Sequence, residues 1–129
     1  MPTIFTRIIK GEIPCEKILE DGDFFAFMDI RPINPGHTLV VPKLEVDKLF
    51  AAPASLLAGI MPFAQRVAKA LRVSVDCKRV GVIVAGFEVP HAHIHLIPIR
   101  EEGELSFSRA RPAVREELAA LGAAIRGNL

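Results

Sequence analysis

Apolar residues recur at two different spacings in the first third of the chain. In segment 3–10 they fall near one face of a helix, with Thr3 in position to cap its start and Gly11 to end it. Three short apolar runs follow, separated by Asp-Gly-Asp and Pro-Gly clusters, at residues 17–19, 24–28 and 37–41. Such punctuation is typical of antiparallel strands joined by turns. The pattern therefore predicts one short helix and then a meander of strands.

A long amphipathic helix is predicted after Pro53, because apolar positions return at helical spacing. These positions are Leu56, Ile60, Phe63, Val67 and Leu71. Pro53 suits the first turn of a helix. Pro62 lies inside the pattern and lacks a backbone donor, so we expect it to bend the helix or divide it in two, unless the helix begins later.

The last third of the chain predicts two more strands and a final helix. The strands cover residues 80–85 and 89–97 on either side of Gly86, and the helix covers about 112–126. Its apolar stripe consists of Val114, Leu118, Leu121 and Ile125. This order predicts an α+β fold in a single domain of residues 1–129, with an antiparallel sheet of about five strands, the long helix packed on one face and a C-terminal helix.

Three of the four histidines occupy alternate positions in the last predicted strand. Alternation along a strand would place His91, His93 and His95 on one face of the sheet. Burying three imidazoles requires hydrogen-bond partners for six ring nitrogens, so an apolar strand would be the less costly way to build a sheet. The row therefore favours a functional site over a purely structural one.

Two kinds of site suit such a row of histidines. Imidazole nitrogens bind zinc, copper and nickel, and Glu88 and Asp29 could in principle complete a metal site. The two cysteines are far apart and form no C-x-x-C pair, so they offer no supporting ligands. The alternative is a relay in which one imidazole orients the next for acid, base or nucleophilic chemistry. The residues alone leave both open.

Residues 91–97 resemble the defining motif of the histidine-triad (HIT) superfamily, in which three histidines alternate with apolar residues. Three further segments are similar to that family in the same order: its opening segment at 4–14, its nucleotide-contacting strand at 26–32, and the strand with a fourth histidine at 35–43. The chain is identified as a member of the superfamily, of its Hint-like branch. The resemblance implies the HIT-like version of the α+β fold.

The resemblance also assigns catalytic roles to the histidines. His93 would attack the α-phosphorus of a purine nucleotide phosphoramidate, dinucleoside polyphosphate or nucleotidyl ester and form a nucleotidyl-histidine that water cleaves. His91 would orient this arrangement, His95 would donate to a phosphate oxygen, and His37 would hold the tautomers from behind. No cofactor and no metal is implied. The alternative function is a nucleotide-binding or scaffolding dimer whose catalysis has decayed.

Nucleotide binding is carried over to the first half of the chain. Asp29 would accept hydrogen bonds from the ribose hydroxyls. An apolar slot for the purine would be formed by Phe5, Ile8, Phe27 and Ile30. The competing interpretation makes Asp29 a turn residue and the other four plain core.

The chain departs from its better-known relatives just before the triad, where it has Gly-Phe-Glu-Val at 86–89. Glu88 stands where those relatives carry a hydroxyl residue that assists the leaving group. It could protonate a leaving group, contact a cationic substituent, point into solvent or pair with Arg100. An ionised carboxylate near a phosphate is repulsive, so the substrate of those relatives is not carried over to this chain.

The charge and composition of the chain limit the classes of partner that we expect it to bind. A net charge of +1 with dispersed basic residues gives no strong attraction to nucleic acid or to an acidic membrane surface. No apolar run is long enough to span a bilayer, and we expect a cytoplasmic protein in which Cys15 and Cys77 are free thiols. The resemblance implies a homodimer with a sheet continuous across both copies. The extra apolar residues Leu57, Met61 and Ala68 on the long helix fit a dimer and core packing equally well.

Overall fold

The computed structural model describes residues 2–129. Its α-helices and strands are, in chain order, α1 (Ile4–Ile9), β1 (Lys17–Glu20), β2 (Phe24–Met28), β3 (Thr38–Pro42), α2 (Ala54–Ser74), β4 (Arg79–Ile83), β5 (Ile94–Ile99) and α3 (Arg115–Gly127). Three short 3-10 helices lie in the connections, at Leu49–Ala51 (η1), Glu102–Glu104 (η2) and Phe107–Arg109 (η3).

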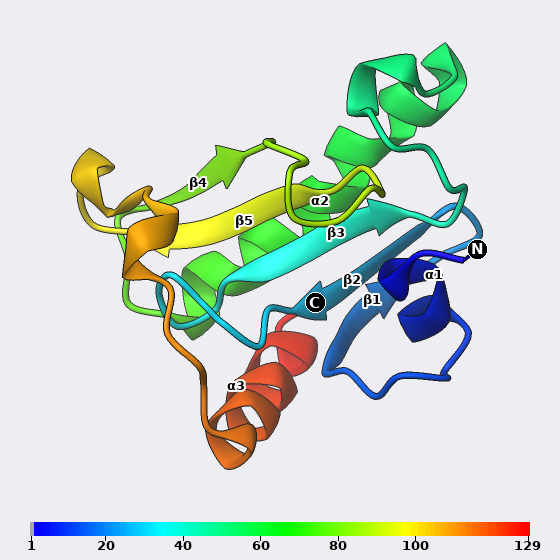
Figure 1. Cartoon of the computed structure of the whole chain (residues 1–129). Helices are drawn as coiled ribbons and strands as arrows, with labels where there is room; N and C mark the ends of the chain where they lie inside the picture. The colour runs from blue at the N-terminus through cyan, green and yellow to red at the C-terminus, as the bar shows by residue number, and fades with distance from the viewer. Residues whose placement is uncertain (1) are drawn as a thin grey trace.

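The five strands form one sheet in the order β1-β2-β3-β5-β4, and every neighbouring pair is antiparallel (Figure 1). β3 and β5 are neighbours although α2 and β4 separate them in sequence. This pairing brings the strand that follows His37 beside the strand that contains His95, with Leu39 opposite His95. The predicted α+β fold is confirmed.

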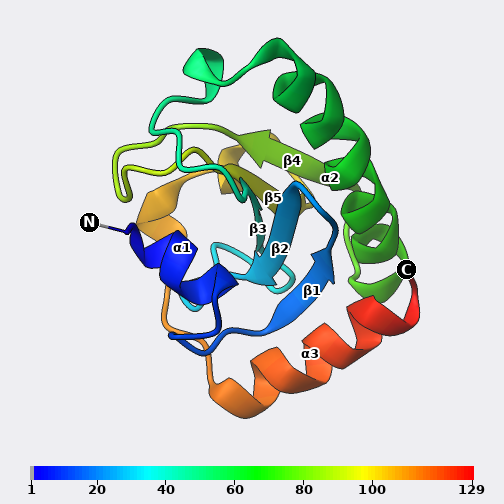
Figure 2. The ribbon, with the colours of Figure 1, turned by 90° about the vertical axis from the view of Figure 1, so that its right-hand side faces the viewer.

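The two faces of the sheet are covered by different helices. Figure 2 shows α1 on one side of the sheet and α2 and α3 on the other. Most strand residues that point toward α2 and α3 are apolar, and those that form the main core with both helices include Phe24, Ala26, Met28, Val40, Ile94 and Leu96. Alternation sends Phe25, Phe27, Leu39 and Val41 to the α1 side, where they pack with Phe5 and Ile8.

The two helix starts follow the sequence pattern closely. Thr3 caps α1, and its hydroxyl accepts a hydrogen bond from the Thr6 backbone N–H. Pro53 immediately precedes α2. Pro62 does not divide α2, which runs unbroken through it, although the ribbon follows a curved path in Figure 2. Pro62 and Ala58, whose carbonyl loses its helical donor, are both exposed, so water can take the place of the missing bond.

The predicted bounds of the last two strands are wrong in opposite directions, because β4 lies earlier in the chain than predicted and β5 lies later. β4 ends at Ile83 rather than 85, and β5 covers 94–99 rather than 89–97. Pairing of β5 with β3 begins at Ile94, because the Ala92 N–H donates to the Val46 carbonyl, beyond the end of β3. Residues 84–93 are therefore a loop, and the alternation argument does not place His91 and His93.

The last helix also begins later than predicted, at Arg115 rather than about 112. The preceding backbone is used elsewhere, since the N–H groups of Arg111 and Ala113 donate to the carbonyls of Pro32 and Ile30. Within residues 2–129, no helix is both long enough and apolar enough to cross a membrane. Cys15 and Cys77 are free thiols, as predicted.

Candidate active site

All four histidines lie together on the α1 side of the sheet, and all four are buried. The ring centroids of His93 and His95 are 4.9 Å apart, and those of His37 and His95 are 5.1 Å apart. Phe5 of α1 packs edge-on against His91 and His93, at 5.6 and 5.0 Å. The predicted clustering therefore occurs, although a loop and α1 bring it about rather than strand alternation alone.

Backbone and ring contacts fix the tautomers of His37 and His95. His37 Nδ1 accepts a hydrogen bond from the Ile33 N–H at 2.9 Å, so the ring hydrogen of neutral His37 is on Nε2. This Nε2–H donates to His95 Nδ1, also at 2.9 Å. The hydrogen of neutral His95 is consequently on its own Nε2.

His91 is held between a strand end and the cap of α1. Its Nε2 lies 2.7 Å from the Pro42 carbonyl, which can only accept, so Nε2 carries the hydrogen. Its Nδ1 lies 2.6 Å from the Thr3 hydroxyl, which then donates to it. The same hydroxyl oxygen caps α1, so this contact couples the position of the helix to that of the His91 ring.

His93 presents an unprotonated nitrogen to its surroundings. Its Nδ1 lies 2.7 Å from the backbone carbonyl of His91, so the ring hydrogen is on Nδ1 and the lone pair is on Nε2. In the described part of the chain, no buried side-chain nitrogen or oxygen lacks a hydrogen-bond partner. The Nε2 atoms of His93 and His95 have no such partner, so they must reach the adjoining cavity, the first with a lone pair and the second with a hydrogen.

Burial keeps the supporting histidines neutral. It lowers the pKa of His37 to about 4. Burial is also the main cause that lowers the pKa of His95 to about 3, with smaller contributions from His37 and His93, and it lowers the pKa of His91. Neutral rings are required for the hydrogen-bond pattern described above, because an imidazolium has no lone pair to accept with.

A cavity of about 470 Å³ opens beside His93 and His95, between the sheet, α1 and the loop after β2. Every residue proposed from sequence for substrate binding lies on its wall; these are Phe5, Ile8, Phe27, Asp29, Ile30 and Glu88. Phe5, Ile8 and Phe27 are also buried core residues, so both interpretations of these three apply. Ile30 is 68% exposed, which separates it from the core and leaves it at the cavity wall.

Asp29 lies between the cavity and the histidines. Its Oδ1 accepts from the Arg31 N–H at 2.9 Å, and its Oδ2 is 3.6 Å from His37 Nε2. Burial raises the pKa of its carboxyl, and the charge of Glu88 raises it further. The second oxygen of Asp29 has no close hydrogen-bond donor within residues 2–129, so it is available to a ligand hydroxyl.

Glu88 lies on the cavity wall that includes His93. Residues 84–93 form a loop, so the alternation of side chains along a strand does not decide where Glu88 points. Arg100 does not pair with Glu88, because its guanidinium is bonded to Asp76.

Two residues contribute more to the site than the sequence indicated. Thr3 was recognised only as a helix cap, and its contact with His91 spans 88 residues. Phe107 of η3 packs against the His95 ring with centroids 5.0 Å apart and lines the same cavity. Local spacing carries no signal for either contact, because each depends on the packing of distant segments.

The carboxylate of Asp29 and the rings of His37 and His95 form a cluster that could be considered for a metal ion, with one ligand atom from each within 4.8 Å of the others. In the observed tautomers, however, His37 Nε2 carries a hydrogen, and the lone pair of His95 Nδ1 accepts that hydrogen. A cation here would have to break the bond from Ile33 to His37. The donor set suits a hydrogen-bond relay better than a metal.

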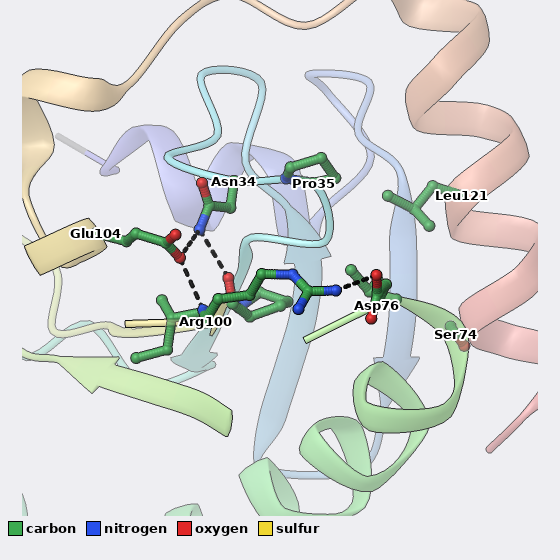
Figure 3. Close-up of a pocket in the computed structure, with 10 residues that line it drawn as sticks. Asn34, Pro35, Ser74, Asp76, Arg100, Glu104 and Leu121 are labelled. Carbon is green, nitrogen blue, oxygen red and sulfur yellow. Dashed lines mark hydrogen bonds and ion pairs between the residues drawn. The ribbon is translucent and has the colours of Figure 1, made fainter. Parts of the chain in front are cut away.

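A second hollow, of about 450 Å³, lies near the C-terminal ends of α2 and β5, and its polar groups are bonded to one another (Figure 3). Arg100 pairs with Asp76, and the Arg100 N–H donates to Glu104. Glu104 also accepts from the Asn34 side chain. The hollow thus contains no cluster comparable with the histidines.

The geometry defines a protein with a histidine relay that ends in a free imidazole nitrogen at a cavity, and comparison with known proteins identifies the class. A sequence model of the HIT domain matches residues 10–102. The chain belongs to the HIT family.

Relatives of known sequence extend over most of the chain. An uncharacterized HIT-like protein of Mycobacterium tuberculosis is 38% identical over 114 residues, which cover 84% of this chain and 79% of that protein. The adenosine 5′-monophosphoramidase HNT1 of Saccharomyces cerevisiae is 42% identical over 100 residues, which cover 77% of this chain and 63% of the yeast protein.

Solved structures share the fold over nearly the whole chain. A HIT-like protein from Bartonella henselae, described as involved in cell-cycle regulation, superposes with a TM-score of 0.87 and 33% identity over 98% of this chain and 96% of that one. A zinc-bound histidine triad protein from Mycobacterium smegmatis gives 0.82 and 31% over 97% and 91%.

Proposed function

We propose that the protein is a nucleotide hydrolase or transferase that cleaves the bond between the α-phosphate of a purine nucleotide and its leaving group. The observation that carries this proposal is the hydrogen bond from His93 Nδ1 to the His91 carbonyl, because it leaves Nε2 unprotonated at the cavity. The names of relatives add support, since they include an adenosine 5′-monophosphoramidase and an adenylylsulfatase.

In the proposed first step, His93 Nε2 attacks the α-phosphorus, a nitrogen–phosphorus bond forms, and the bond to the leaving group breaks. The His93 ring becomes positively charged, and the Nδ1–H bond to the His91 carbonyl strengthens as that charge develops. His95 Nε2–H donates to a non-bridging phosphate oxygen. The leaving group takes a proton from solvent water and departs.

In the second step, water attacks the phosphorus of the nucleotidyl-histidine and gives up a proton to solvent, while His93 leaves with its electron pair. The nucleoside monophosphate is released, and the imidazole returns to its starting tautomer. His37 and His91 are positioning residues in this scheme, because they contact the two reacting histidines and hold no reacting atom themselves.

The nucleotide would occupy the cavity of about 470 Å³ beside His93 and His95. The purine would lie against Phe5, Ile8, Phe27 and Ile30, and the ribose hydroxyls would lie at Asp29. A volume of about 470 Å³ is suited to a ligand of this size. The wall is mostly apolar, and its charged and polar side chains include Asp29, Arg31, Glu88 and the two histidines.

The test is turnover of a fluorogenic adenosine phosphoramidate and of diadenosine polyphosphates, with and without a chelator. We expect release of adenosine monophosphate at a rate that the chelator does not change, because the relay needs no ion. Tight nucleotide binding without turnover of any member of the panel would favour the scaffolding alternative, and loss of activity in chelator would favour a metal enzyme.

We also propose a homodimer in which the β4 edges of two copies meet. β4 pairs only with β5, and two of the valines at this edge, Val82 and Val84, are 45% and 46% exposed. Sedimentation should give twice the 14.1 kDa chain mass, and Val82→Glu should weaken the association. A monomer at all concentrations would contradict this assembly.

We also propose a cytoplasmic location, because two free thiols suit a reducing compartment such as the cytoplasm.

A further inference from the structure

A second, smaller cavity of about 100 Å³ adjoins the triad on the side of the loop before β5. Its wall consists of residues 85–88, His93, His95 and Phe107. Four of these residues, Glu88, His93, His95 and Phe107, also line the larger cavity. A ligand whose scissile bond lies at His93 would therefore have one part in each cavity.

We propose that the smaller cavity is a leaving-group subsite that selects amine leaving groups with a second, positively charged end. Glu88 supplies the charge that attracts this end, and Phe87 and Phe107 supply aromatic surface around it. The inference rests on the proposed nucleotidyl hydrolase function and adds a substrate class to it.

The charge at this position has no partner within the protein. Glu88 makes no ion pair or hydrogen bond to any residue of 2–129. Burial is the main cause that raises the pKa of the Asp29 carboxyl, and the negative charge of Glu88 raises it further. A carboxylate beside a nucleotide phosphate repels it. A cation placed at the carboxylate would offset that repulsion, whereas a neutral or anionic leaving group would not.

The aromatic surface is unusually open. Phe87 is 96% exposed although it is a large apolar side chain, and it lies at the mouth of the small cavity. Gly86 precedes it with a φ of +83°, a backbone conformation that turns the chain here and that other residues rarely adopt. Phe107 lines the same cavity and packs against the His95 ring. Aromatic faces attract cations, so these two rings and one carboxylate suit an alkylammonium group.

Solvent access distinguishes this role from proton donation. Glu88 is exposed, so its carboxylate keeps its hydration. An ionised carboxylate accepts hydrogen bonds but has no proton to give to a departing amine. Selection of a cation therefore fits the position better than general-acid catalysis.

The experiment compares three adenosine 5′-phosphoramidates whose alkylamine chains have equal length and end in an ammonium, a methyl or a carboxylate group. We expect kcat/KM for the ammonium substrate to exceed that for the methyl substrate about tenfold, the scale of one exposed ion pair plus one cation–π contact. The carboxylate substrate should be the poorest.

Variants assign the preference to the subsite. Glu88→Gln should remove most of the preference for ammonium over methyl, and Phe87→Leu, on an exposed position that the fold does not need, should reduce it in part. Glu102→Gln is the matched control, because it removes the same charge from an exposed position outside both cavities. It should keep the wild-type ratio.

Equal kcat/KM for the three substrates, or an unchanged ratio in Glu88→Gln, would overturn the subsite. So would an equal slowing of all three by Glu88→Gln, which is the behaviour of a proton donor. In each of these cases turnover of the methyl substrate would leave the proposed hydrolase function intact. If wild type cleaves none of the three, the proposed function itself fails, and the subsite with it.

Discussion

The two faces of the sheet are built from the same strands and serve different ends. On the face toward α2 and α3, strand residues such as Val40, Ile94 and Leu96 are apolar and buried. On the α1 face, the next residues along, such as Leu39 and His95, lie beside imidazoles and a cavity. One face stabilises the fold mainly with apolar side chains, and Thr38, a polar residue buried on it, is hydrogen-bonded to the Gly36 carbonyl, whereas the other face bears the cost of burying four histidines.

The largest expected effect belongs to the α1 face. His93→Ala should reduce kcat about a thousandfold or more, because the nucleophile is removed, while nucleotide affinity by calorimetry changes little. The side chain of His93 makes one hydrogen bond, to a backbone carbonyl, but it is buried and packs against Phe5 and His95, so the melting temperature should fall while the variant remains folded. Residual activity above about a tenth of wild type would exclude His93 as the nucleophile.

The opposite face should show the reverse pattern. Leu71 of α2 is fully buried in the main core, and Leu71→Ala should lower the free energy of unfolding by about 2–5 kcal/mol. The folded variant should keep kcat within a factor of about two. Val73→Ala is the control on the same helix, because Val73 is exposed and should change stability by less than about 0.5 kcal/mol. A large loss of kcat in Leu71→Ala would contradict the claim that one face of the sheet contributes stability and the other contributes catalysis.

The comparison also predicts how stability depends on pH. The pKa of His37 is about 4 and that of His95 about 3 in the folded protein, against 6.5 for an ordinary histidine. Below pH 6.5 the unfolded chain therefore binds protons that the folded protein excludes, and the free energy of unfolding falls as the pH drops toward 4. Each histidine contributes about 1.4 kcal/mol per pH unit to this slope.

Urea denaturation between pH 7 and pH 4.5 measures that slope. Leu71→Ala should give a curve parallel to wild type, because it changes no titrating group, and His37→Gln should give a shallower one. Asp29 acts in the opposite direction, since burial raises its pKa, but only near the acidic end of the range. A wild-type stability that does not change from pH 6.5 to 5 would contradict the assignment of neutral buried histidines.

The smallest expected effect is a change in nucleotide affinity through the ribose hydroxyls. Asp29→Asn keeps the shape of the side chain but loses the charge-assisted acceptor, so it should weaken ribonucleotides about tenfold and 2′-deoxyribonucleotides less. Asp23→Asn, an exposed carboxylate outside the cavity, is the matched control. Equal losses for both nucleotides by calorimetry would remove Asp29 from the ribose site.

Sequence reasoning recovered the parts of the fold that local pattern determines. The cap at Thr3, the start of α2 after Pro53 and the α+β architecture follow from residue type and spacing. The start of β5 could not be predicted in this way, because it depends on where β3 ends and on the bond from Ala92 to Val46. The continuity of α2 through Pro62 depends equally on which side of the helix faces solvent.

The candidate site, like the fold, can be predicted from the sequence only in part. The motif placed four histidines together, but their tautomers depend on the Ile33 N–H, the Pro42 carbonyl and the Thr3 hydroxyl. Two of these partners come from segments far away in sequence, so no spacing rule identifies them. The sequence does not place Glu88, because residues 84–93 form a loop and strand alternation does not apply to them.

The central claim is that the hydrogen bond from His93 Nδ1–H to the His91 carbonyl leaves His93 Nε2 free to act as a nucleophile, and mapping of the covalent intermediate tests it most directly. Wild-type protein mixed with an adenosine phosphoramidate is quenched in alkali during turnover, digested and analysed by mass spectrometry. We expect one adenylyl group on the peptide that contains the triad, with fragmentation assigning it to His93. An adduct on a different residue, or turnover with no adduct at any time, would contradict the account.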